Sequence, residues 1–211
     1  MKFCFKYIAY LSVLIGFQSA IAGAYEDYFR ALKVDNASAV SELLARGFDP
    51  NSPDEKGQMG LHLAFREGAS KVAAILLMQP AIRVDAANAA DETPVMIAAL
   101  RGNLDGVQQL LARGASVNRS GWSPLHYAAT GPEVKVVAAL LEKGAQVDAQ
   151  SPNGTTALMM AARYGSDDSA ELLLRQGAST SLRNQKGMNA ADFAASVGRV
   201  ALATRLRPPA R

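Results

Sequence analysis

The stretch SPLHYAATGPEVKVVAALLEKGAQVD, residues 123–148, holds in one run the features that recur along this chain of 211 residues. A Ser-Pro-Leu-His run precedes two alanines, an apolar segment carries the pair Leu140-Leu141, and Gly144 follows that pair. We expect the apolar segment to form a helix that ends before Gly144, because glycine readily adopts the positive φ required after a helix. The stretch therefore predicts two short helices joined by a tight turn and followed by a polar loop.

The leucine pair belongs to a series with a nearly constant spacing. The steps are 33, 34, 30, 33 and 33 residues, between Leu43, Leu76, Leu110, Leu140, Leu173 and Leu206. A small-residue patch precedes the later leucines, and we expect it to begin the first helix of each unit, where small side chains let neighbouring helices approach closely. The patches are Ala64-Phe65, Ala98-Ala99, Ala128-Ala129, Ala161-Ala162 and Ala194-Ala195. Units of this size cannot bury their apolar faces alone, so a fixed period indicates that they stack.

Glycines mark two further positions in the units. The first follows the small-residue patch and is expected to permit the tight turn into the second helix. These glycines are Gly68, Gly102, Gly165 and Gly198. The second follows the leucines and is expected to take positive φ where the second helix ends. These are Gly47, Gly114, Gly144 and Gly177. One unit has Pro80 at this second position, and because proline cannot take positive φ, its helix end must be built differently.

These features make the chain resemble the ankyrin repeat family, which has a period of about 33 residues and the signature T-P-L-H-x-A. The signature reads SPLHYA at residues 123–128, with degraded copies TPVMIA at 93–98 and TALMMA at 156–161. The resemblance covers about Tyr25 to Leu206 and implies an all-α solenoid of about six helix-turn-helix units with β-hairpin-like finger loops. The expected units span about residues 25–57, 58–91, 92–121, 122–154, 155–187 and 188–211.

The resemblance also implies structural roles for signature residues. Within it, His62 and His126 tie neighbouring loops together by hydrogen bonds, and Ser123 caps the first helix of its unit. The loop at residues 118–122 is three residues short, so its finger should be stunted. The last unit should be a cap with a polar outer face. That face is expected from Arg199, Arg205, Arg207 and Arg211.

Residues 1–24 have the composition of a cleavable secretory signal peptide. Two lysines form a basic start, an apolar run covers residues 7–17, and small residues at alternate positions follow. We expect cleavage after Ala22 or Ala24 and a periplasmic or secreted protein. The alternative is an uncleaved leader that holds the chain at the membrane, although the apolar run is shorter than the roughly 20 residues that span a bilayer.

Composition and motifs exclude several function classes for the chain that follows the leader. It retains 20 basic and 19 acidic residues, a balance that offers no electrostatic footprint for nucleic acid or membrane lipid. Cys4, the only cysteine, lies in the leader, so disulfides and thiolate sites are not expected. No nucleotide-binding or metal-binding motif occurs, so we expect no cofactor and no metal.

Two pairs of residues invite a catalytic or metal-binding interpretation. Ser123 and His126 have the residue types of a nucleophile and its base, but no orienting group or oxyanion site accompanies them, so we expect no enzyme. Asp167-Asp168 are expected at a helix start, where carboxylates interact favourably with the helix dipole, rather than in a metal site.

We therefore expect a monomeric, non-enzymatic protein–protein interaction module that binds a protein partner as a scaffold, protector or inhibitor. Ankyrin proteins bind through finger tips and the exposed side of the first helices, and the resemblance carries that role onto a set of positions. These are Glu55, Lys56, Gln58, Arg66, Glu67, Glu92, Leu100, Arg101, Arg119, Trp122, Arg163, Tyr164, Gln185, Lys186 and Met188. Trp, Tyr and Arg are the commonest interface anchors. For Trp122, packing over the shortened finger is an equally good interpretation.

Two other functions stay open: a membrane-tethered structural factor that organises an envelope complex, and a hydrolase.

Overall fold

The computed structural model describes residues 23–208, in which short helices alternate with turns and loops and no strand occurs. The predicted leader lies outside the described residues except for positions 23 and 24. Residues 23–33 form the first helix, which is followed by α2 (Ala37–Ala45). The other helices are α3 (Gly60–Glu67), α4 (Ser70–Met78), α5 (Pro94–Leu100), α6 (Leu104–Ala112), α7 (Pro124–Thr130), α8 (Val134–Glu142), α9 (Ala157–Arg163), α10 (Asp167–Arg175), α11 (Ala190–Ala195) and α12 (Val200–Arg205). These helix pairs confirm the predicted all-α fold.

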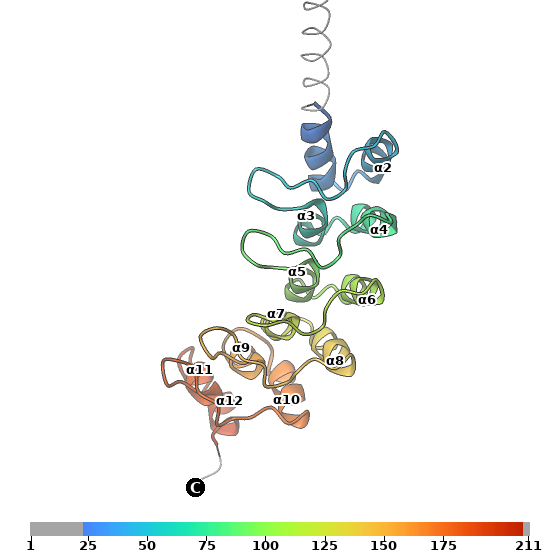
Figure 1. The fold of residues 1–211 in the computed structure, drawn as a ribbon. Helices are drawn as coiled ribbons and strands as arrows, with labels where there is room; N and C mark the ends of the chain where they lie inside the picture. The colour runs from blue at the N-terminus through green and yellow to red at the C-terminus, as the bar shows by residue number, and fades with distance from the viewer. Residues whose placement is uncertain (1–22, 209–211) are drawn as a thin grey trace, which may run out of the picture. The chain divides into compact units, whose positions relative to one another are not determined.

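The described chain divides into two compact parts, residues 23–82 and residues 83–208, each of which contains several repeats. Within residues 23–82, α4 packs against both α2 and α3. Within residues 83–208, α5, α7, α9 and α11 contact one another in succession, and α6, α8 and α10 form a parallel series beside them (Figure 1). Within residues 83–208, α7 and α9 therefore each lie between the equivalent helices of the repeats before and after them, which is the stacking that the sequence period predicts.

The periodic leucines form the core, as their spacing predicts. All six are buried, with 6% exposure at Leu43 and none at Leu110 or Leu140. The second leucine of a pair is only half-buried at Leu111 and Leu141. The register thus identifies the more deeply buried leucine of each pair.

The small-residue patches lie at the end of each first helix and not at its start, so the predicted position was wrong. Ala161 and Ala162 directly precede Arg163, the last residue of α9, and the patches of α5, α7 and α11 occupy equivalent places. The helix starts earlier because Thr156 caps it, its hydroxyl accepting from the Met159 amide at 3.4 Å. Both alanines are fully buried, so their small size still serves close helix packing.

The turn glycines do not all adopt the same backbone conformation. Gly102 and Gly198 take positive φ values of 69° and 77°, as the tight turn requires. Gly165 does not take positive φ, so the turn there does not use the left-handed conformation. A Cβ at Gly165 would lie 2.1 Å from the carbonyl oxygen of Ala129, in α7. Glycine is required at this position because the backbones of two neighbouring units approach each other.

The end of α4 differs from the others, as Pro80 predicts. The residue after this helix, Gln79, has φ −71° and ψ 126°, so the chain leaves the helix in an extended conformation. After α6 and α8 the chain turns through Gly114 and Gly144, with φ values of 89° and 86°. No left-handed residue follows α4, because the ring of Pro80 prevents a positive φ at that position.

Arg199 does not belong to a polar outer face, and the prediction for this arginine was wrong. Its Nη1 donates to three carbonyl oxygens at the end of α9, including that of Gly165 at 3.0 Å. Arg199 and Arg205 also pair with Asp167, which lies in the first turn of α10 as predicted. The hydrogen bond from Arg199 is the main cause that holds the pKa of Asp167 below its ordinary value. The last unit is thus tied to the one before it by charge-assisted hydrogen bonds.

Candidate functional site

Four loops share one turn geometry and form the predicted hairpin-like fingers. In each, the amide of the first residue donates to the carbonyl oxygen of the fifth at 2.8–3.0 Å. The loops are Asp54 to Gln58, Asn88 to Glu92, Ser151 to Thr155 and Asn184 to Met188. Each turns through a left-handed fourth residue, which is Asp91 in the second finger and glycine in the others. Lys56 and Lys186 are exposed at finger tips, as expected for contact positions.

The short finger at residues 118–122 is held by its own side chains. Asn118 donates from Nδ2 to the Gly144 carbonyl at 2.8 Å and accepts from the Gln146 amide at 2.9 Å. Arg119 is half-buried and forms an ion pair with Asp91. The stunted finger thus bridges the units on either side of it, and the guanidinium of Arg119 already has an intramolecular partner.

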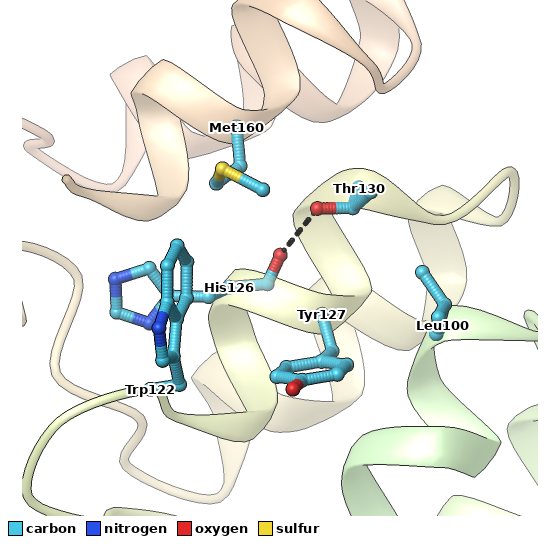
Figure 2. Close-up of a pocket in the computed structure, with 6 residues that line it drawn as sticks. All are labelled: Leu100, Trp122, His126, Tyr127, Thr130 and Met160. Carbon is cyan, nitrogen blue, oxygen red and sulfur yellow. Dashed lines mark hydrogen bonds between the residues drawn. The ribbon is translucent and has the colours of Figure 1, made fainter. Parts of the chain in front are cut away.

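Trp122 follows the short finger and lines a cavity in front of α7. It is half-buried, and the edge of its ring packs against His126, with ring centroids 5.2 Å apart and an interplanar angle of 77°. In Figure 2 the ring of Trp122 extends toward Met160, which comes from α9. The cavity, here called the apolar hollow, has a volume of about 220 Å³ and is lined by Leu100, Trp122, His126, Tyr127, Thr130 and Met160.

A second cavity, of about 320 Å³, shares Trp122 and Met160 with the apolar hollow, and we call it the basic hollow. Its charged lining residues are Arg163 and Lys186, and none of the described residues that line it is acidic. Arg163 lies 5.2 Å from the ring centroid of Tyr164, which is 57% exposed. The remaining lining residues are Asn153, Thr155, Asn184, Met188 and Phe193.

The hollows bring together six of the residues predicted to bind a partner. These are Leu100, Trp122, Arg163, Tyr164, Lys186 and Met188. Glu92, Arg101, Arg119 and Gln185 belong to the same unit but line neither hollow; Gln185, for example, donates from its side chain to the Pro152 carbonyl at 2.9 Å. The rest lie in the unit of residues 23–82. They are Glu55, Lys56, Gln58, Arg66 and Glu67. Their roles in binding stay predictions.

Sequence reasoning missed four residues of the apolar hollow, His126, Tyr127, Thr130 and Met160, and two of them, Tyr127 and Met160, share a place in the repeat. Both occupy the variable x position of the T-P-L-H-x-A signature. Tyr127 of α7 and Met160 of α9 therefore face the hollow while the residues directly before and after each of them are buried. The x positions of successive units, taken as a set, are the signal that would have identified this surface.

His126 joins two loops, as the resemblance implies. Its Nε2 donates to the Thr155 carbonyl at 2.9 Å, since a carbonyl oxygen can only accept, and Nδ1 is 2.8 Å from Ser123 Oγ. Both Ser123 and His126 are buried. This arrangement selects the tautomer of His126 that is protonated at Nε2, and that proton is donated to the Thr155 carbonyl. Ser123 and His126 thus have the geometry of a helix cap and of a hydrogen bond that joins neighbouring loops.

The buried imidazole of His126 makes stability depend on pH. Burial is the main cause that lowers its pKa from the ordinary value of about 6.5. The unfolded chain therefore binds a proton at a higher pH than the folded chain, so stability is full above about pH 6.5 and falls as pH decreases through the lower folded pKa. Urea unfolding between about pH 7.5 and 5 measures the effect. Replacing His126 with glutamine should flatten this part of the profile; an unchanged profile would contradict the assignment.

Comparison with known proteins identifies the repeat. A sequence model of ankyrin repeats, three copies long, matches residues 29–120, 82–151 and 135–208. The chain belongs to the ankyrin repeat family. Its ankyrin repeats make it a protein–protein interaction module.

The ankyrin fold is shared by a solved structure, the Bd0816 predatory endopeptidase from Bdellovibrio bacteriovorus in complex with immunity protein Bd3460. A chain of that complex aligns with a TM-score of 0.72 over 86% of this chain and 98% of its own length, at 24% identity.

Curated relatives share the ankyrin repeats over part of their length. The nuclear factor NF-kappa-B p105 subunit of Gallus gallus is 31% identical over 161 residues, which is 73% of this chain and 16% of that protein. The B-cell lymphoma 3 protein homolog of Mus musculus is 31% identical over 152 residues, which is 69% of this chain and 34% of that protein. The ankyrin chain thus spans a minor part of each of these relatives.

Proposed function

We propose that this ankyrin repeat chain acts in the periplasm as a non-enzymatic binding protein that scaffolds, protects or inhibits a protein partner. The observation that carries the proposal is the pair of hollows on either side of Trp122 and Met160, which combine an apolar cavity with exposed aromatic and basic side chains. The composition of residues 1–24 supports export to the periplasm.

The size of the apolar hollow and the residue types beside the basic hollow favour a protein partner over a small-molecule ligand. The apolar hollow, at about 220 Å³, is smaller than the roughly 300–1,000 Å³ of sites that enclose drug-sized molecules. A cavity of this size suits a single side chain of a partner. Exposed Tyr164 and the neighbouring Arg163 are residue types that dominate binding energy in protein interfaces. Because the solved complex with a similar chain pairs an endopeptidase with an immunity protein, inhibition or protection of an enzyme is the first role to test.

Affinity capture from periplasmic extract by the purified mature chain, with crosslinking and mass spectrometry, tests the proposal. We expect a specific protein to be recovered. Replacing Tyr164 with alanine should weaken its binding by about 2 kcal/mol, the size typical of an interface anchor, without lowering the melting temperature because Tyr164 is exposed. Trp122→Ala should weaken binding at least as much.

Val200→Ala serves as the control, because Val200 is 70% exposed and lines neither hollow, so it should leave capture unchanged. Since Trp122 also packs on His126, Trp122→Phe separates the two effects by preserving an aromatic ring. Recovery of no specific protein, or binding by Tyr164→Ala equal to that of the unmodified chain, would contradict the proposed surface.

An uncleaved leader defines the second candidate function, a structural factor held at the inner membrane. The apolar run at residues 7–17 motivates it. None of the helices in residues 23–208 has the length and apolar character needed to cross a bilayer, and the leader itself lies outside these residues. Amino-terminal sequencing of the protein from cells decides between the two: a chain that begins at Gly23 or Tyr25 is released, and one that begins at Met1 is tethered.

A further inference from the structure

The apolar hollow and the basic hollow are two halves of one surface. Trp122 and Met160 line both cavities, so these two side chains form the wall between them. The residues of both hollows come from the same unit of the chain, residues 83–208. A partner segment that crosses this wall would therefore place neighbouring side chains into the two hollows at once.

Of the four side chains with polar groups that line the apolar hollow, His126, Tyr127 and Thr130 already have hydrogen-bond partners within the chain, and the fourth group is the indole N–H of Trp122. The Thr130 hydroxyl donates to the His126 carbonyl at 2.9 Å, as the dashed line in Figure 2 shows. The imidazole of His126 bonds Ser123 and Thr155, and the Tyr127 hydroxyl donates to Glu92 at 3.4 Å. Apart from the indole N–H of Trp122, a polar group of an occupant would find no unoccupied strong partner among these side chains, which costs free energy. The hollow therefore selects an apolar side chain.

The basic hollow selects the opposite chemistry. Its Arg163 uses Nη1 to donate to Ser196 Oγ at 2.9 Å, whereas its Nε is buried without a hydrogen-bond partner among the described residues. Lys186 is exposed at the tip of the last finger, on the rim of the same cavity. Two cations with no acidic residue in the lining favour an anionic occupant, and a guanidinium is particularly well matched to a carboxylate.

We infer that the partner presents an extended segment in which a large apolar side chain enters the apolar hollow and an adjacent aspartate or glutamate enters the basic hollow. This inference rests on the proposed function, because it specifies the partner of that same surface. The carboxylate is assigned to a protein side chain and not to a free anion, because the shared Trp122–Met160 wall places the two subsites within reach of one segment.

Panning a library of short random peptides on the purified mature chain tests this chemistry without knowledge of the natural partner. We expect enriched peptides to combine a large apolar residue with a nearby Asp or Glu. Trp122 is the only tryptophan in the chain, so its fluorescence reports occupancy of both hollows directly. Titration with the most enriched peptide, made synthetically, should shift the emission of Trp122.

Charge-reversal variants identify the groups that recognise the acid. Lys186→Glu and Arg163→Glu should each weaken that peptide at least about tenfold, as expected for loss of a charge-assisted contact. Lys186→Glu alters an exposed finger tip, so it tests the inference even if the substitution at Arg163, which also removes the bond to Ser196, disturbs folding. Lys143→Glu is the matched control: it changes net charge equally at an exposed position that lines neither hollow, and binding should be unaffected.

The outcomes separate this inference from the proposed function. Absence of enriched peptides, enrichment without acidic residues, or peptides that bind without changing Trp122 emission would each overturn the inferred chemistry. If a partner captured from the periplasm bound Lys186→Glu and the unmodified chain equally well, the proposed function would stand and the inference would fail. Acidic peptides that bind as expected, with no protein captured from the periplasm, would support the inferred chemistry and contradict the proposed function. Self-association of the chain that Lys186→Glu abolishes would identify a second copy as the occupant and overturn the inferred partner.

Discussion

Replacing Gly165 with alanine is expected to destabilise the protein by about 3 kcal/mol or more, at or above the upper end of the range for overpacking. The added Cβ would lie 2.1 Å from the Ala129 carbonyl oxygen and 3.0 Å from the Cα of Ala161, which are backbone atoms and cannot rotate away. Relief requires α9 to move from α7, and the carbonyl of Gly165 would then also move from Arg199. Urea unfolding followed by circular dichroism measures the loss.

Gly177→Ala is the matched control for this substitution. A Cβ added at Gly177 would meet no other atom within 4 Å, but the residue takes φ +86°, so alanine there should cost only the roughly 1–2 kcal/mol of a left-handed backbone. The comparison isolates the steric term, because both variants add the same methyl group. Equal destabilisation by the two substitutions would show that the contact between Gly165 and Ala129 is not the constraint described above.

The second large effect is expected at the leucine register. Leu140→Ala should lower the free energy of unfolding by about 2–5 kcal/mol, because Leu140 is fully buried and its removal leaves a cavity. Leu141→Ala should cost about 1 kcal/mol, because that side chain is only half-buried. The two variants have the same composition, so differences in unfolded-chain properties largely cancel in the comparison.

Denaturant unfolding of both variants under identical conditions provides the measurement. A larger loss at Leu141 than at Leu140 would mean that the buried leucine of the pair is misassigned, and with it the 33-residue register. The same comparison at Leu110 and Leu111, which have the same pattern of burial, provides an independent check.

The repeating fold could be predicted from the sequence because each unit carries its own local signals. Serine or threonine at the cap, glycine at positive φ after the second helix, and one buried leucine per period are all short-range requirements. Their repetition identifies the register even where a single copy is degraded, as at Thr156. The effect of Pro80 was predictable for the same reason, since it depends only on the geometry of proline itself.

The candidate site was only partly predictable. Trp122, Arg163 and Tyr164 were accessible to sequence reasoning because residue types common in interfaces occupy known contact positions. Tyr127 and Met160 were not, because their position in the repeat is variable and their cavity exists only where neighbouring repeats of residues 83–208 pack together. The pairing of Arg119 with Asp91 was equally invisible, since the two residues are 28 positions apart.

The amino-acid sequence by itself determined the repeat, the helix ends, the buried leucines and the absence of a thiol outside the leader, because each depends on residues close together in the chain. The tertiary structure alone decided why Gly165 must be glycine, that Arg199 turns inward to the end of α9, and that Trp122 and Met160 separate an apolar from a basic hollow. These features arise between stacked units, where the distance between backbones depends on how side chains of both units pack.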